Sequence, residues 1–422
     1  MSNTPKIRFS GFTEDWEQRK LEDYLEVSSE KNRDELLGKE DVLSVSGEVG
    51  IVNQIEFQGR SFAGVSVANY GIVEVGDVVY TKSPLKSNPY GIIKTNKGKT
   101  GIVSTLYAVY KPKKNVDSEF VQIYFESDFR MNSYMHPLVN KGAKNDMKVS
   151  DANALKGPVF FPKIEEQIVI SQYFNSLDHL ITLHQRKYDD TKLLKKYMLQ
   201  KMFPQNGQKV PEIRFSGFTG DWEQRKLIDL VDVLDGDRGK NYPTSDDFDI
   251  SGHTLFLNAS NVTNDGFLFQ DNQFITEEKS NSLGNGKLEE DDIVVTSRGS
   301  LGHIAWYNAD ISSFVPYARI NSGMLILRNK EEIETEYLYH FMKSSKGQSQ
   351  ISFISFGSAQ PQLTKKGVED LEVILPTRRD EQVQLGHYFS NLDHLITLHQ
   401  RKCDELQELK KYMLQNMFPQ KG

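Results

Sequence analysis

Residues Tyr173–Gln205 read YFNSLDHLITLHQRKYDDTKLLKKYMLQKMFPQ, and residues Tyr388–Gln420 read YFSNLDHLITLHQRKCDELQELKKYMLQNMFPQ. The two segments are identical at 25 of 33 positions. In both, apolar residues recur every three or four positions, which is typical of one face of a helix, and Pro204 and Pro419 end the pattern. A helix of about 36 residues is ~54 Å long. Because a single apolar stripe on such a rod needs a partner, we expect the two copies to pack antiparallel, with pseudo-two-fold symmetry.

The predicted interface between these helices consists of the apolar stripe of each copy. Its residues are Ile170, Phe174, Leu177, Ile181, His184, Leu194 and Met198 in the first copy, and Leu385, Phe389, Leu392, Ile396, His399, Leu409 and Met413 in the second. An alternative is that each helix is buried inside its own domain, but the opposite face is strongly polar over Arg186–Lys196. His179 and His184 are five positions apart, which does not bring two histidines together on a helix, so we predict no metal site.

A second repeat precedes each of these segments. PKIRFSGFTEDWEQRKL at Pro5–Leu21 returns as PEIRFSGFTGDWEQRKL at Pro211–Leu227, with 15 of 17 positions identical. The stretches between the repeats, 22–172 and 228–387, look nearly unrelated. Duplication followed by drift would spread the differences evenly, whereas here two blocks are almost unchanged. We infer that the blocks make the same contact twice, while the intervals recognise different targets.

Composition indicates a globular chain of 422 residues, long enough for two domains. A single cysteine, Cys403, excludes an internal disulfide framework and fits a reducing cytosol, and no apolar run is long enough for a membrane span. The net charge of −7 argues against a general nucleic-acid binder. Locally, residues 76–148 carry 12 Lys/Arg and 6 Asp/Glu, but residues 236–300 carry 5 and 12. If both regions bind DNA, the second must use a few well-placed groups.

Both intervals have the pattern of mixed α/β domains. Strands are predicted at Asp77–Thr81, Val103–Tyr110, Asp292–Thr296 and Met324–Leu327. The first and third of these correspond to each other, and polar loops containing Gly or Pro follow them. Asn140–Asp146 likewise corresponds to Ser355–Pro361.

The polar loops carry the residue types that read base edges, Arg and Lys for guanine and Asn and Gln for adenine, together with groups that contact phosphates. The candidate DNA-binding residues of the first interval are Lys82, Ser83, Lys86, Asn88, Tyr90, Lys94, Lys97, Lys141, Lys144 and Asn145. Those of the second are Arg238, Lys240, Asn241, Tyr242, Asn258, Asn261, Ser297, Arg298, Arg319, Ser358, Gln360 and Gln362.

Three stretches resemble catalytic motifs without completing them. Asn88-Pro89-Tyr90 lacks one proline of the adenine-methyltransferase motif, and Gly98-Lys99-Thr100 lacks the first glycine of a phosphate-binding loop. The acidic run Glu289–Asp292 has no accompanying lysine at nuclease spacing. We therefore predict no catalytic residues and no metal site in this chain.

The chain resembles the specificity subunits of type I restriction-modification systems over essentially its whole length. The resemblance rests on the repeat at 7–21 and 213–227, on Glu-Gln followed by a long helix at 166–202 and 381–417, and on Gly357–Leu363. The first interval departs from the pattern at 142–148, where the Gln-Pro pair is missing.

The resemblance implies a mixed α/β (α+β) fold with two target-recognition domains separated by an antiparallel pair of coiled-coil helices. The expected divisions are 1–165 and 205–380 for the recognition domains, and 166–204 and 381–422 for the spacer helices. Each domain would read one half of a bipartite, asymmetric DNA site, and half-sites one turn apart lie ~34 Å from each other. The expected partners of this cytoplasmic, non-catalytic chain are double-stranded DNA, two modification subunits and up to two restriction subunits. S-adenosylmethionine, ATP and Mg would belong to those subunits.

Two other functions remain open at this point. A pure assembly scaffold would bind proteins through its helices without reading DNA. A self-sufficient methyltransferase or nuclease would act on DNA alone.

Overall fold

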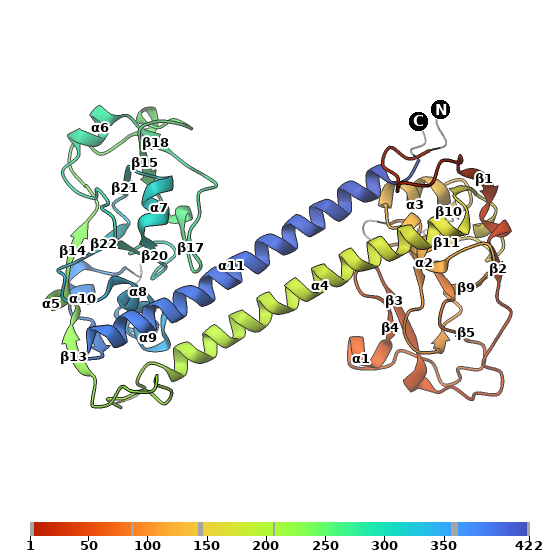
Figure 1. The fold of residues 1–422 in the computed structure, drawn as a ribbon, viewed down its shortest axis with the longest axis horizontal. Coiled ribbons are helices and arrows are strands. Elements are labelled where there is room, and N and C mark those ends of the chain that lie inside the picture. Colours follow the sequence, from red (N-terminus) through yellow and green to blue (C-terminus); the bar gives the residue numbers. More distant parts are fainter. Residues whose placement is uncertain (1–3, 86–87, 142–146, 206, 356–361, 420–422) are drawn as a thin grey trace. The chain divides into compact units, whose positions relative to one another are not determined.

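The computed structural model describes residues 4–85, 88–141, 147–205, 207–355 and 362–419, in two compact units. Unit 1 comprises Met1–Gln185 and Arg401–Gly422, and unit 2 comprises Arg186–Gln400. The two long helices, α4 (Ile164–Lys201) and α11 (Arg379–Asn416), each contribute one part to each unit (Figure 1). The four domain boundaries expected from the sequence stay a prediction, because the units are built from interleaved parts of the chain.

The two helices run antiparallel within each unit. In unit 1, Lys410 of α11 pairs with Asp178 of α4, with Nζ 2.7 Å from Oδ1. In unit 2 the equivalent pair is Lys195 of α4 and Asp393 of α11, with Nζ 2.6 Å from Oδ2. The antiparallel packing predicted from the repeat is confirmed in each unit.

Each unit contains a four-stranded antiparallel sheet with the same strand order. In unit 1 the order is β2 (Leu25–Val27), β9 (Tyr107–Pro112), β6 (Val78–Thr81) and β7 (Ile93–Thr95). In unit 2 it is β14 (Val231–Asp235), β22 (Met324–Asn329), β19 (Asp292–Thr296) and β20 (Ile304–Tyr307). The duplication therefore extends through the intervals whose sequences look unrelated, and the predicted correspondence of β6 and β19 is confirmed.

Shorter elements complete the units. In unit 1 these are the strand pairs β1 (Glu17–Lys20) with β12 (Pro158–Phe161), β3 (Leu43–Ser46) with β4 (Gly50–Asn53), β5 (Gly71–Val73) with β8 (Gly101–Val103), and β10 (Asn140–Lys141) with β11 (Met147–Lys148), and the helices α1 (Gln54–Gln58), α2 (Ser118–Tyr124) and α3 (Asp128–Met135). In unit 2 they are β13 (Glu223–Lys226) with β23 (Glu372–Leu375), β16 (Val262–Thr263) with β17 (Gly266–Phe267), the sheet β18 (Phe274–Ile275), β15 (Thr254–Leu257), β21 (Ala318–Ile320), and the helices α5 (Leu227–Leu230), α6 (Glu277–Ser282), α7 (Ala309–Phe314), α8 (Thr335–Lys343), α9 (Ser345–Ser355) and α10 (Lys365–Glu369). The predicted strand Val103–Tyr110 is wrong in its extent, since β8 ends at Val103 and β9 begins at Tyr107.

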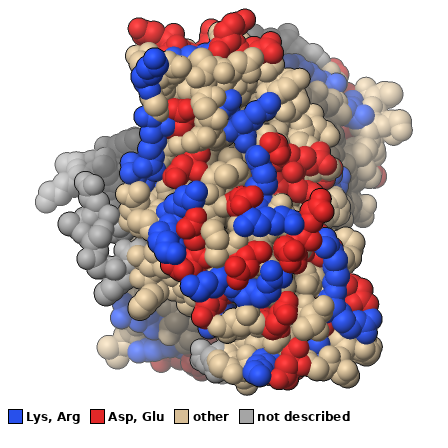
Figure 2. Space-filling view, turned by 90° about the vertical axis from the view of Figure 1, so that its left-hand side faces the viewer, with Lys and Arg blue, Asp and Glu red and all other residues tan. Residues whose placement is uncertain are grey.

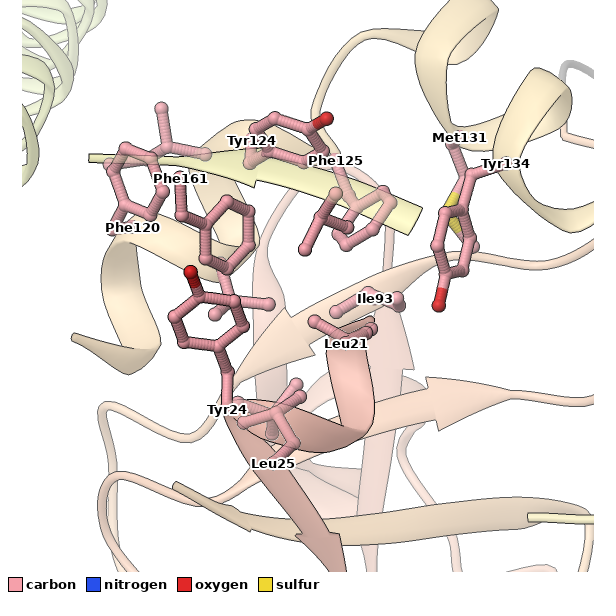
Figure 3. Close-up of a cluster of buried hydrophobic side chains, with 14 of the residues drawn as sticks. Leu21, Tyr24, Leu25, Ile93, Phe120, Tyr124, Phe125, Met131, Tyr134 and Phe161 are labelled. Carbon is pink, nitrogen blue, oxygen red and sulfur yellow. The ribbon is translucent and has the colours of Figure 1, made fainter. Parts of the chain in front are cut away.

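An aromatic core joins the sheet-containing part of each unit to the long helices. In unit 1, Phe120 of α2 packs edge-on against Phe161 of β12, with ring centroids 4.9 Å apart (Figure 3). Phe418, which follows α11, lies 5.9 Å from Phe120 and Trp16. In unit 2, Phe203 holds the equivalent place after α4. Each unit is thus completed by the far end of the helix that begins in the other unit.

The near-identical blocks make the same buried ion pair in both units. Arg8 binds Glu166 in a bidentate way, with nitrogen–oxygen distances of 2.7 Å, and Arg214 binds Glu381 at 2.7 and 2.8 Å. Both glutamates are buried at the start of a long helix. This pairing explains why the block at 5–21 and the Glu-Gln pair near the start of α4 recur together, as the block at 211–227 and the Glu-Gln pair near the start of α11.

Within the described residues, no helix is both long and apolar enough to cross a membrane.

Candidate nucleic-acid interface

In unit 2 the polar loops meet at a turn, Asn321–Gly323, between β21 and β22. The turn is attached to the end of β15, because Asn321 N donates a hydrogen bond to Leu257 O at 3.1 Å. Its own amide side chain closes it, since Asn321 Oδ1 accepts from Gly323 N at 2.8 Å. This turn could not be identified from the sequence, because its importance depends on which loops pack against it.

Two candidate residues approach the turn from one side. Arg238 Nη2 donates to Ser322 O at 3.3 Å and to Asp235 Oδ1 at 3.4 Å. Tyr242 accepts a hydrogen bond from Ser322 N at its hydroxyl, at 3.4 Å. Lys240 and Asn241, which lie between them, are exposed, and Asn241 Nδ2 donates to Ser282 O at 3.0 Å.

Three further candidates approach from the other side. The backbone nitrogens of Ser297 and Arg298 both donate to Gly323 O, at 2.8 and 3.2 Å. Leu363 N donates to Ser297 O at 3.0 Å, which brings the half-buried Gln362 to the same place. The Arg298 side chain is exposed, and within the described part of the chain it forms no ion pair.

Asp237 fixes the loop that carries Arg238. Its carboxylate accepts from Gly239 N at 2.6 Å and from Gly284 N at 2.7 Å. These hydrogen bonds hold the pKa of Asp237 below its ordinary value. Sequence reasoning missed this residue, because an aspartate in an acidic stretch gives no sign that it anchors a loop.

Other candidates of unit 2 are held inside it. Arg319 is buried and donates to Ser280 Oγ at 2.9 Å and Asn285 O at 2.8 Å. Asn261 is also buried, and its Oδ1 accepts from Asn258 N at 3.0 Å. Their role in DNA binding stays a prediction. In the structure, both side chains make hydrogen bonds that hold the neighbouring loops in place.

Unit 1 groups three of its candidates near α3 and β11. Lys82 Nζ lies 2.9 Å from Asp151 Oδ1, and the buried Asn88 donates to Asp128 Oδ1 at 2.7 Å. Tyr90 packs edge-on against His136, with ring centroids 5.7 Å apart. Ser83 is half-buried beside Lys82.

Lys94 and Lys97 line a groove of about 910 Å³ beside α4, and Asn88 and Asp128 also line it, whereas Lys82 and Tyr90 do not. Lys94 is buried and lies 3.7 Å from Glu126, which also binds Lys410 at 2.9 Å. Although burial raises the pKa of Glu126, the two lysines outweigh it and hold that pKa below the ordinary value. Lys97 is exposed and pairs with Glu119 at 3.3 Å. The structure therefore does not bring all candidates of unit 1 into one cluster.

Some candidates cannot be placed. Lys86, Lys144, Asn145, Ser358 and Gln360 lie outside the described residues, and Lys141 is described only as part of β10.

The predicted interface residues are buried in the first part of each long helix and less buried further along it. Ile170, Phe174, Leu177, Leu385, Phe389 and Leu392 are buried, whereas Ile181, His184, Met198, Ile396, His399 and Met413 are half-buried. Leu194 and Leu409 are exposed. The residues that follow these two leucines bind the opposite helix instead. Lys195 of α4 pairs with Asp393 of α11, and Lys410 of α11 pairs with Asp178 of α4.

The acidic character of unit 2 is partly structural. Asp292, in the run that resembled a nuclease site, is buried and binds Arg328 at 2.8 Å. Burial raises the pKa of Asp292, and Arg328 opposes that shift. Figure 2 shows Lys/Arg and Asp/Glu side chains intermixed over the face it presents, rather than a broad basic field. Nor do the described residues contain a group of three or more His, Cys, Asp or Glu side chains that could hold a metal ion.

Comparison with known proteins points to one family. Residues 219–408 match the model of the type I restriction modification DNA specificity domain. A putative type I restriction enzyme MjaX specificity subunit from Methanocaldococcus jannaschii is 20% identical over 98% of this chain and 95% of its own length. The MjaVIII specificity subunit of the same organism is 22% identical over 60% of this chain and 59% of its own. The crystal structure of a type I restriction-modification S subunit from M. genitalium shares the fold, with a TM-score of 0.61, 14% identity, and coverage of 99% of this chain and all of that one.

Proposed function

Since the chain belongs to the type I restriction-modification specificity subunits, which are recognition components rather than enzymes, we propose that it reads a bipartite, asymmetric DNA site and directs adenine methylation and restriction by its partners. Unit 1 would read one half-site and unit 2 the other. Direct readout from the loops would supply specificity, and phosphate contacts would set the register.

The observation that carries this proposal is the combination of one architecture with two loop chemistries. Both units have the same strand order and the same helix tether. At the loop after the corresponding strands β6 and β19, however, unit 1 has Lys82, paired with Asp151, whereas unit 2 has the exposed Arg298, which forms no ion pair with the described residues. Equivalent positions with different hydrogen-bonding groups are what a reader of two unlike half-sites requires.

We further propose that two modification subunits dock on the repeated helices and that up to two restriction subunits join them. S-adenosylmethionine, ATP and Mg would be bound by those subunits, and the target adenine would leave the stack to be methylated there. A repeated apolar surface supports this arrangement. Four exposed apolar residues of the helices recur at equivalent positions, namely Leu180, Leu183, Leu409 and Tyr412 in unit 1, and Leu395, Leu398, Leu194 and Tyr197 in unit 2.

An exchange of recognition regions tests the proposal. Residues 22–165 are replaced by those of a related subunit, and methylated adenines are mapped across the genome in cells with the original and the hybrid chain. We expect the methylated sequence to change in one half only. An unchanged sequence would favour an assembly scaffold, and methylation by the purified chain alone would favour a self-sufficient enzyme.

A further inference from the structure

We infer that Arg238 and Arg298 are the base-reading pair of unit 2, and that the half-site it recognises contains two guanines close together. The inference rests on the proposed function, which it extends by naming bases. It is carried by the position, charge and support of the two arginines.

The two arginines flank one short turn. The Arg238 guanidinium binds Ser322 O, and the Arg298 backbone binds the carbonyl of the next residue, Gly323. A Cβ atom built on Gly323 would lie 3.8 Å from Arg298 Cβ, so the turn and the loop that carries Arg298 are in contact at that point. Neighbouring base pairs are ~3.4 Å apart along the duplex, and side chains rooted on both sides of a three-residue turn can reach base pairs of one half-site.

Their charges stand out against an acidic background. Residues 236–300 contain 12 Asp/Glu against 5 Lys/Arg, and many cations of unit 2 are neutralised, such as Lys226 by Asp370 and Lys330 by Asp232. Arg298 has no ion-pair partner among the residues with described positions, and Arg238 meets only Asp235, at 3.4 Å. An acidic domain that binds DNA must place its few available cations where they contribute most to specificity.

The support beneath the pair is closely packed. A Cβ on Gly236 would lie 2.2 Å from Asn321 O, so the loop that carries Arg238 is seated directly on the turn. Asp237 clamps the same loop through two backbone amides. A guanidinium on a fixed base loses less conformational freedom when it binds, which is the condition for selective contact.

The chemistry of the side chain identifies the base. Arginine presents a planar fork of N–H donors that matches O6 and N7 of guanine in the major groove, and each such pair discriminates against the wrong base by roughly 5- to 150-fold. Lysine keeps the charge but lacks the fork. Substitution by lysine therefore separates base reading from charge.

The experiment uses the full chain in cells that also express its modification partner. Methylated adenines are mapped for the unaltered chain and for Arg238→Lys, Arg298→Lys and Lys240→Ala. The unaltered chain should methylate a site with at least two guanines, on either strand, in the unit 2 half. Each lysine variant should relax the preference at one of those positions by fivefold or more, without relaxing the half-site read by unit 1.

The controls keep two failures distinct. Lys240→Ala removes a neighbouring exposed charge and should reduce methylation at all sites without altering base preference. If the unaltered chain gives no bipartite pattern, the proposed function fails. If the pattern is bipartite but the unit 2 half has fewer than two guanines, or the lysine variants leave every preference intact, the arginine pair alone is refuted.

Discussion

Arg8 and Arg214 hold the start of each long helix through a buried carboxylate. Replacement of Arg214 by alanine leaves Glu381, which is 1% exposed, without its cation. Removal of one partner of a buried pair costs about 3–5 kcal/mol, and we expect the lower end because the arginine is partly exposed. Urea denaturation of the full chain measures the loss. Arg19→Ala, in an exposed pair with Glu17, should change stability far less, because exposed ion pairs contribute little. Equal effects of the two variants would contradict the role of Arg214 as a tether.

His340 makes the stability of unit 2 depend on pH. It is fully buried on α8, and its Nε2 lies 3.0 Å from Ser390 Oγ. Burial lowers the pKa of His340 well below its ordinary value near 6.5. The unfolded chain therefore binds a proton that the folded chain rejects, so stability is intact above pH 6.5 and falls below it by about 1.4 kcal/mol per pH unit.

The first unit supplies a matched control for this effect. The backbone N–H groups of Asp117 and Glu334 donate equivalent hydrogen bonds to the side-chain oxygens of Gln167 and Gln382. This correspondence aligns α2 with α8 and makes Ile123 the counterpart of His340. The variant His340→Ile should lose the acid-dependent component between pH 5 and 6.5 in denaturation curves. If its pH dependence matched that of the unaltered chain, His340 would not be the source.

Individual site residues were only partly predictable from the sequence. Arg238, Tyr242 and Arg298 were selected by residue type, and the structure gathers them at one turn. Arg319 was selected by the same rule but is buried. Residue type cannot distinguish the two cases, because exposure depends on contacts between distant segments.

At the scale of elements, the long helices were the most predictable part of the fold. A stripe repeated in two near-identical segments identifies both the helix and its partner, whereas the short strands of unit 2, such as β16 and β17, have too few residues for a periodic pattern. The break between β8 and β9 was missed because Val103–Tyr110 is rich in β-branched and aromatic residues on both sides of the break, which is typical of a strand.

A proline in the middle of α4 should disrupt the helix pair. Leu180 is exposed, so the variant Leu180→Pro acts mainly through the backbone, where proline removes a hydrogen bond and costs about 3 kcal/mol or more. We expect weaker association with the modification subunit, measured by co-purification. Leu180→Ala controls for loss of the side chain, and full assembly of the proline variant would count against docking on the helices.

At the scale of the whole molecule, the repeated apolar surfaces predict a stoichiometry. Leu183→Glu alters the surface of unit 1, and Leu398→Glu alters its equivalent in unit 2. Each should reduce the number of bound modification subunits from two to one, and the double variant should bind none, because a charge opposes burial in an apolar contact. Native mass spectrometry counts the copies.

The control for this prediction lies outside the repeat. Phe314 is an exposed apolar residue of α7, and Phe314→Glu should leave both copies bound. Two copies on either single variant would exclude these surfaces as the docking sites.

Because Phe418 lies in the core of unit 1, this unit can finish folding only after almost the whole chain has been synthesised. At roughly 5–20 residues per second, the ribosome needs tens of seconds to extend the chain from the end of the first segment at Gln185 to this ring. During that interval the nascent first unit lacks one of its core aromatic side chains. We therefore expect a chain that ends before this ring to have a destabilised first unit.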